Sequence, residues 1–264
     1  METATEIAYS IVVPLYNEQD NVLPLYTRIV EAMVDTGGPY EIVFVDDGSR
    51  DGTVSLLEEL CRGYEDRAGI LQCERNRGKA EAVRRGVLHA IDRYADSIAG
   101  YRDADLATPL HAVTGLRRIL DERPEVQMVF GSRVKLLGRR VERRAARHYL
   151  GRVFATIVSG MLRLAIYDTQ CGAKLFRVTP DFRQVFSQPF LSKWVFDVEI
   201  VARYLNLYHR DTARLERAIY EYPLEAWVDV AGSKVRIRDF VTAFVDIVRI
   251  RKKYLSGARY SQTS

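Results

Sequence analysis

Short apolar runs alternate with helix-like segments through the first half of the chain. The runs are rich in β-branched residues, as is typical of strands buried on both faces of a sheet. Regular alternation of strand and helix predicts an α/β fold, in which a mainly parallel sheet carries helices on both faces and the crossovers are right-handed. The expected strands are residues 7–13, 41–45, 70–73, 98–102 and 126–131, and the expected helices are residues 22–34, 54–64, 80–94 and 110–122.

Acidic and polar residues gather where three of these strands end: Asn17-Glu18, Asp46-Asp47 and Asp103-Ala104-Asp105. Two carboxylates two positions apart on an extended segment share one side. Beyond the carboxyl edge of an α/β sheet, such a pair can hold a divalent cation that carries phosphate oxygens. Taken alone, the third group is better explained as an Asp-rich turn. Three polar strand ends that face one crevice, however, favour a nucleotide site.

The composition suits a globular protein with one large domain. The chain has 264 residues and is 47% hydrophobic, so we expect a domain over residues 1–235 and a basic amphipathic helix and tail over residues 236–264. The three cysteines lack metal-ligand spacing and predict reduced thiols in a cytosolic setting. The N-terminus has no secretory pattern. No run reaches the roughly 18 to 20 apolar residues of a membrane-spanning helix.

Basic residues are concentrated in the second half, where residues 133–152 contain eight Lys or Arg and one acid, Glu142. An apolar helix is expected over residues 147–166, a helix over 196–206, a strand over 218–223, and a last helix with a basic end over 237–254. Basic amphipathic helices favour membrane surfaces, although ordinary packing on the core explains the last helix equally well. Aromatic residues are not interleaved with the basic residues of this stretch, as they are where side chains stack on nucleic-acid bases. We therefore expect no nucleic-acid partner, and a peripheral position on the cytoplasmic face of a membrane.

Seven short motifs, in order along the chain, resemble those of the family 2 glycosyltransferases with the GT-A fold. Four lie in the first half: VPLYNE at residues 13–18, VDDGSRDGT at 45–53, NRGK at 76–79 and DAD at 103–105. Three lie in the second half: GSR at 131–133, DTQCGAKLF at 168–176 and WVFDVE at 194–199. The second set is similar to dolichyl-phosphate mannose and glucose synthases, and most similar to the glucosyl type. The resemblance covers roughly residues 11–234.

This resemblance implies a metal-dependent hexosyltransferase that inverts the anomeric carbon. The donor would be a nucleotide sugar, with UDP-glucose favoured over GDP-mannose, and the acceptor a polyprenyl phosphate of the dolichyl type. Carried over by motif, the residues that would hold the nucleoside are Pro14, Tyr16, Glu18 and Asp47. Asp105, supported by Asp103, would bind Mg²⁺ or Mn²⁺ on the diphosphate. The cations expected around the phosphates are Arg133, Arg147 and Lys234. Lys79 either reaches a donor phosphate or simply opens a helix.

The acceptor decides whether a catalytic base is needed. A metal neutralises the charge on the departing diphosphate without proton transfer. A phosphate monoester, with a second pKa of about 6, is largely dianionic at neutral pH and attacks without a base. A sugar hydroxyl needs a carboxylate base, for which Asp197 and Glu199 are the candidates. A glycosyltransferase that uses a soluble acceptor is therefore an alternative. A non-catalytic nucleotide-binding module is a weaker one, because the chain retains Asp105.

Overall fold

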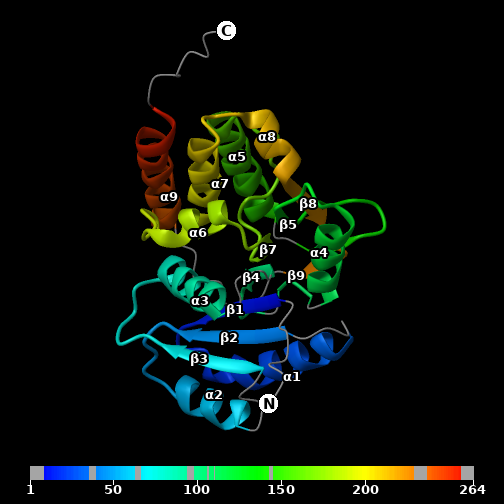
Figure 1. Ribbon diagram of the computed structural model, residues 1–264, viewed down its shortest axis with the longest axis vertical. Coiled ribbons are helices and arrows are strands. Elements are labelled where there is room, and N and C mark those ends of the chain that lie inside the picture. Colours follow the sequence, from blue (N-terminus) through cyan, green and yellow to red (C-terminus); the bar gives the residue numbers. More distant parts are fainter. Residues whose placement is uncertain are drawn as a thin grey trace.

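One large sheet flanked by helices forms the centre of the molecule (Figure 1). The computed structural model describes residues 9–35, 40–62, 67–93, 98–105, 107–109, 111–142, 145–228 and 237–256. The strands are β1 (Tyr9–Leu15), β2 (Tyr40–Asp46), β3 (Ala68–Gln72), β4 (Ile98–Arg102), β5 (Met128–Ser132), β6 (Arg140–Glu142), β7 (Ala173–Arg177), β8 (Ile219–Pro223) and β9 (Ala226–Val228). The helices are α1 (Gln19–Asp35), α2 (Thr53–Cys61), α3 (Lys79–Arg93), α4 (His111–Glu122), α5 (Ala145–Leu162), α6 (Pro180–Ser187), α7 (Phe196–Leu207), α8 (Thr212–Ala218) and α9 (Ile237–Ile250), followed by the π-helical η1 (Arg251–Leu255).

The main sheet has seven strands in the order β3-β2-β1-β4-β7-β5-β8. Strands β1 to β4 pair in parallel, and β5 pairs in parallel with β8. Strand β7 lies between β4 and β5 and is antiparallel to both. The predicted mainly parallel sheet is confirmed, whereas β7 was not expected. The strands β6 and β9 form a separate two-stranded parallel sheet.

Successive side chains along each central strand point to opposite faces of the sheet, and each face carries its own hydrophobic core. In β1, Val12 joins one core, while Ile11 and Val13 join the other. Helices α1, α2 and α4 close the second core, and helices α3, α5, α6, α7 and α9 close the first. Because both faces are covered, the strands of the first half are apolar throughout, as parallel strands usually are.

The second half departs most from the prediction. Helix α5 ends at Leu162, earlier than expected, because Arg163 adopts a left-handed conformation with φ 54°. Two short helices were not expected: α6, capped by the Thr179 hydroxyl, and α8, capped by the Asp211 carboxylate. The long last helix is divided into α9 and η1. Among the residues that the model describes, no helix is long and apolar enough to cross a membrane.

Candidate active site

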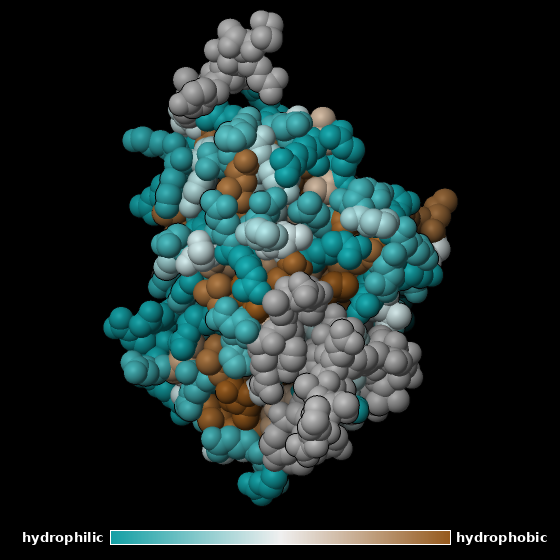
Figure 2. Space-filling model, in the orientation of Figure 1, coloured by the Kyte–Doolittle hydropathy of each residue, from teal (hydrophilic) through white to brown (hydrophobic). Residues whose placement is uncertain are grey.

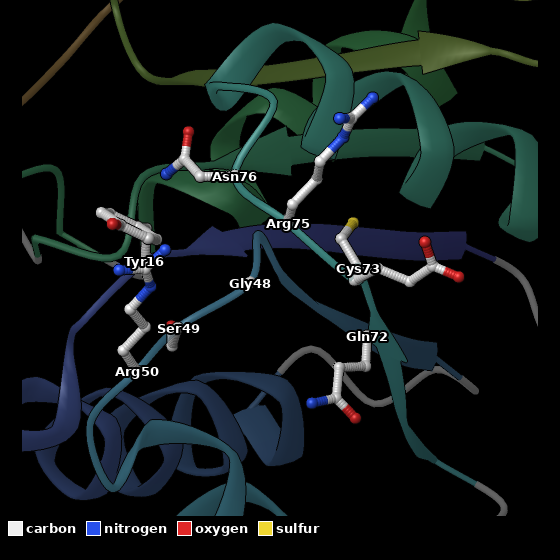
Figure 3. Close-up of a pocket in the computed structure, with 9 residues that line it drawn as sticks. Tyr16, Gly48, Ser49, Arg50, Gln72, Cys73, Arg75 and Asn76 are labelled. Atoms are coloured by element: carbon white, nitrogen blue, oxygen red, sulfur yellow. The ribbon is translucent and has the colours of Figure 1, made fainter.

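A cavity of about 450 Å³ opens at the carboxyl ends of β1, β2 and β3. Tyr16 and Arg50 stand on one side of it and Gln72 and Cys73 on the other, with Gly48 between them (Figure 3). The full lining is Tyr16, Gly48, Ser49, Arg50, Gln72, Cys73, Glu74, Arg75 and Asn76. Open α/β sheets bind ligands beyond the carboxyl ends of their strands, and this volume suits a nucleoside.

The floor of the cavity is the turn that follows β2. The buried Asp46 carboxylate accepts hydrogen bonds from the N–H groups of Gly48 at 3.1 Å and Ser49 at 3.1 Å. Gly48 has φ +74°, and a Cβ there would lie 2.7 Å from backbone atoms of Arg75. The turn therefore requires glycine both for its left-handed backbone and for its close contact with the loop after β3.

Asp47 connects this turn to the start of α3. Its carboxylate accepts hydrogen bonds from the N–H of Arg77 at 2.9 Å and the N–H of Gly78 at 2.7 Å. Gly78 is also left-handed, with φ +96°. Asp47 thus fixes the loop between the cavity and Lys79, the first residue of α3.

The loop after β1 is tied to the loop before α2. The N–H of Asn17 donates to Ser49 Oγ at 2.9 Å, and the N–H of Glu18 donates to Thr53 Oγ1 at 2.9 Å. Glu18 Oε2 accepts a hydrogen bond from Asn21 Nδ2 at 2.6 Å, within the first turn of α1. Pro14 lies inside β1 opposite Val45. Of the four residues expected to hold the nucleoside, Tyr16 lines the cavity; Pro14, Glu18 and Asp47 support its walls.

Lys79 reaches the acidic pair at the end of β4. Its ammonium lies 2.5 Å from Asp103 Oδ1, and the two side chains are 34% and 32% exposed. Burial is the largest single influence on Lys79 and disfavours its charge, but the carboxylates of Asp103, Asp197 and Asp105 together outweigh it, so the pKa of Lys79 is raised. Asp105 Oδ1 accepts the N–H of Ala107 at 3.1 Å. Burial and the neighbouring Asp103 carboxylate raise the pKa of Asp105.

A buried ion pair lies next to this site. Lys174 Nζ, from β7, is 2.6 Å from Asp197 Oδ1, from α7, and 2.5 Å from the carbonyl oxygen of Cys171. The hydroxyl of Tyr101, from β4, also donates to Asp197 Oδ1. Burial and the Asp197 carboxylate raise the pKa of Tyr101. Asp197 is only 4% exposed, so its carboxylate lies behind the acidic strand end and away from the surface.

Arg133 forms a bidentate salt bridge with Asp168. Its Nε and Nη2 atoms donate to the two carboxylate oxygens at 2.6 and 2.7 Å. Burial opposes the charge, but Asp168 outweighs it and raises the pKa of Arg133. Glu221 on β8 accepts the N–H groups of Tyr167 at 2.8 Å and Asp168 at 2.7 Å. This network fixes the segment before β7 against the end of β5.

Two residues expected near the phosphates fall outside the described part of the site. Lys234 lies outside the described residues, and Arg147 lies in α5 at a position whose side chain is not described. The structure places Tyr16 in the cavity wall, Asp47 in the turn beside the cavity, and the Lys79–Asp103 pair at the start of α3. The Arg133–Asp168 pair lies at the end of β5, on the other side of β7 from β4, and is near enough for Asp103 to contribute to the raised pKa of Arg133.

The comparison with protein families decides the classification. The model of glycosyl transferase family 2 matches residues 10–182, well over half of the chain. The chain belongs to glycosyl transferase family 2. This family 2 glycosyltransferase is 32% identical to a dolichyl-phosphate beta-glucosyltransferase of Saccharomyces cerevisiae, over 96% of the chain and 76% of that protein. The family predicted from the motifs is therefore confirmed.

Solved glycosyltransferases share the fold. Mannosyl-3-phosphoglycerate synthase from Rubrobacter xylanophilus superposes with a TM-score of 0.64 at 19% identity, covering 97% of this chain and 77% of that one. Glucosyl-3-phosphoglycerate synthase from Mycobacterium tuberculosis, solved with Mn²⁺ and UDP, gives 0.57 at 18% identity, covering 92% and 77%. The predicted GT-A fold is confirmed.

The acidic pair of this family 2 glycosyltransferase fits a divalent metal bound together with a nucleotide. Within the described residues, no group of three or more His, Cys, Asp or Glu side chains is arranged to hold a metal. Mg²⁺ commonly takes one or two carboxylates and completes its shell with water and substrate phosphates. Asp103 and Asp105 supply two carboxylates at one strand end, so an ion would bind with the donor diphosphate.

Sequence reasoning missed two residues that support the candidate site, Lys174 and Glu221, and it expected Asp46 only as an acidic residue at a strand end. Asp46 carries a readable signal, because an Asp two residues before a Gly often caps its own turn. Lys174 stands inside the apolar run AKLF and Glu221 inside a mixed strand. Their partners lie far away in sequence, so only the fold identifies them.

Proposed function

We propose that this glycosyltransferase transfers glucose from UDP-glucose to a polyprenyl phosphate of the dolichyl type, with inversion at the anomeric carbon. The observation that carries the proposal is the 32% identity, along 96% of the chain, to a protein named dolichyl-phosphate beta-glucosyltransferase. Since the match extends past the nucleotide-binding half, it includes the segments that would meet the acceptor.

The donor side is arranged for a nucleoside diphosphate. The cavity would bind the nucleoside beside Tyr16. From the cavity wall, Asp47 contacts Gly78, and the next residue, Lys79, contacts Asp103, so the diphosphate would lie between the cavity and Asp103. Asp105 and Asp103 would hold Mg²⁺ or Mn²⁺, which supplies positive charge to the leaving diphosphate. Lys79 would add a second positive charge there, because its raised pKa keeps its ammonium protonated at neutral pH.

The geometry of the two base candidates favours an acceptor that needs no base. The Asp197 carboxylate is buried and bound by Lys174 and Tyr101. The Glu199 carboxylate is also buried, and it accepts hydrogen bonds from Arg203 at 2.8 Å. A phosphate, already ionised at neutral pH, attacks without losing a proton. We propose that Asp197 positions β4 through Tyr101, and that it does not touch the substrate.

The acceptor phosphate would be bound by Arg133, Arg147 and Lys234, as the motifs suggest. Arg133 would approach it as part of the Arg133–Asp168 pair, which holds the guanidinium in a fixed orientation. We further propose that the enzyme lies peripherally on the cytoplasmic face of a membrane. Exposed apolar side chains on α5 (Leu150 and Val153) and on α9 (Phe244, Val245 and Val248) support this placement.

The deciding experiment measures transfer of labelled glucose from UDP-glucose to a short polyprenyl phosphate. The matched acceptors are the corresponding unphosphorylated alcohol and soluble sugars. We expect transfer to the phosphate alone, abolished by Asp105→Ala. Equal transfer to the alcohol, or transfer to a soluble sugar only, contradicts the lipid-phosphate acceptor and leaves the family and fold unaffected.

Two further measurements test the donor and the acceptor separately. Calorimetry should show tighter binding of UDP than of GDP, and the opposite order reverses the choice of donor. Arg147→Ala should weaken acceptor use while leaving UDP affinity unchanged, because a lost charged hydrogen bond leaves the acceptor phosphate poorly compensated. Arg118→Ala, an exposed arginine on α4, is the control for loss of one positive charge.

A further inference from the structure

Two leucines stand at the tip of the loop between β5 and β6. Leu137 is fully exposed and Leu136 is 46% exposed. Figure 2 shows hydrophobic surface projecting at the right edge of the molecule, the side on which Figure 1 draws the green loop that follows β5. A single exposed leucine is ordinary, but two adjacent leucines on a projecting turn expose apolar surface that none of the neighbouring described residues covers.

The turn is held in place by its own hydrogen bonds. The N–H of Arg139 donates to the carbonyl of Leu136 at 3.1 Å, and Gly138 has φ +80°. These features match a type II turn with glycine at its third position. Arg139 Nη1 lies 3.0 Å from Glu225 Oε1, and the N–H of Arg140 donates to the Glu225 carbonyl at 2.9 Å. The hydrogen bonds and the ion pair hold the turn in one conformation. The turn therefore loses little conformational entropy when the leucines bind another surface.

Basic residues flank this turn; Arg139 is paired with Glu225 and Arg140 with Glu142. Lys135 is exposed directly before the leucines, and Arg140 is exposed directly after the turn. Residues 133–152 contain eight basic residues and one acidic residue. Apolar side chains at the tip and basic side chains at the base match the layers of an anionic bilayer, in which phosphate headgroups lie above the acyl chains. A convex tip of two residues is too small for a stable protein interface, which buries about 800 Å² on each partner.

The loop also starts at the site itself. Arg133, the first residue after β5, is bound by Asp168, so the base of the loop is fixed beside the end of β5. A bilayer that received the tip would lie close to the residues proposed to hold the acceptor phosphate. The loop would then bring the enzyme to an acceptor whose tail remains in the lipid.

We propose that the Leu136–Leu137 turn inserts into the boundary between headgroups and acyl chains of an anionic phospholipid bilayer. The inference rests on the proposed function in one respect: an acceptor that lies in the membrane explains why the enzyme would bind a bilayer. Lipid binding itself does not depend on which sugar is transferred or on whether transfer occurs.

The test measures flotation of the full chain with phosphatidylcholine vesicles, prepared with and without phosphatidylserine. We compare the wild type, the double variant Leu136→Ser with Leu137→Ser, and the control Leu23→Ser, an exposed leucine on α1 in the nucleotide-binding half. The wild type and the control should bind the serine-containing vesicles equally and bind neutral vesicles less. The double variant should bind about 100-fold more weakly, since each of the two buried leucines contributes roughly tenfold.

Insertion is distinguished from surface adsorption with Leu137→Trp. Its fluorescence should be quenched by phospholipids brominated on the acyl chain. Unchanged vesicle binding by the double variant, or absence of quenching, overturns the proposal. A thermal unfolding midpoint equal to that of the wild type verifies that the double variant is folded. If the wild type binds vesicles through the leucines but transfers glucose to no phosphate acceptor, the proposed function fails and this inference stands.

Discussion

Substitution of Gly172 tests whether the position of the acidic pair controls catalysis. Gly172 lies just before β7, and its carbonyl accepts the N–H of Asp103 at 2.8 Å. A Cβ added at Gly172 would lie 2.7 Å from Asp103 Oδ1, and closer still to Oδ2 and Cγ. Non-bonded heavy atoms keep roughly 3.5 Å apart. In Gly172→Ala, the Asp103 carboxylate must therefore move by about 1 Å or more.

The expected loss is larger in catalysis than in stability. A displacement of about 1 Å at a reacting centre costs on the order of 100-fold in rate, equivalent to about 2.7 kcal/mol in activation free energy. Overpacking costs about 1–3 kcal/mol in the free energy of unfolding. The lower end applies here, because the Asp103 side chain is 32% exposed and can turn towards solvent. The shift also separates Asp103 from Lys79, so both charges at the proposed diphosphate site are displaced.

The assay is the steady-state rate of glucose transfer at saturating Mn²⁺, with urea unfolding measured in parallel. Gly160→Ala on α5 is the control, since a Cβ there meets nothing within 4 Å. The control should keep the wild-type rate and gain up to about 1 kcal/mol from helix propensity. If Gly172→Ala keeps the wild-type rate with wild-type stability, the placement of Asp103 by the segment before β7 does not matter for catalysis.

Three other variants or conditions give separate expectations. Asp197→Asn leaves the buried Lys174 ammonium without its counter-charge and should lower the free energy of unfolding by about 3–5 kcal/mol in urea titrations; an unchanged midpoint would show that the pair is not needed. Gly48→Ala should weaken UDP binding at least tenfold in calorimetry, because φ is +74° and the new Cβ would meet the Arg75 backbone; wild-type affinity would contradict this. Burial raises the pKa of Asp105 above 3.8, so protons compete with Mn²⁺ at higher pH than for a free Asp. Mn²⁺ affinity, titrated in the presence of UDP, should fall as the pH is lowered towards this raised pKa, and affinity that is constant down to pH 3.8 would refute that assignment.

The strands of the first half were predictable because strands that are buried on both faces consist mainly of apolar, β-branched residues. Strand β2 was expected at residues 41–45 and spans Tyr40–Asp46, with every residue buried. Strand β1 was expected to stop before Pro14 but continues to Leu15. Its pairing with β4 ends at Val12, so Pro14 has a neighbouring strand on one side only and its missing N–H costs little. The length of β1 therefore depends on which strands lie beside it, and a single sequence does not show which strands pair.

Strand β7 could not be predicted, since its identity depends on distant partners. It contains Lys174, whose charge is typical of a surface residue. In the fold, the side chain is buried between Asp197 and the rings of Tyr101 and Phe130. The DTQCGAKLF motif pointed to an important segment without revealing that it enters the sheet. The acidic strand ends, in contrast, were placed correctly because parallel strands bring their carboxyl ends to one edge.

The insertion of β7 makes the donor site depend on the second half of the chain. Strand β4, which carries the acidic pair at its end, is paired with β7 from Ile98↔Arg177 to Arg102↔Ala173. The same strand is held from its side-chain face, because Tyr101 donates to Asp197, which also binds Lys174 of β7. The ligands expected for the metal therefore take their position from residues up to 94 places later in the sequence. Helix α7, which carries Asp197, lies beyond residue 182, where the match to the family model ends. The position of the acidic pair therefore depends on β7 and α7, and we expect a substitution that displaces either element to displace the acidic pair as well.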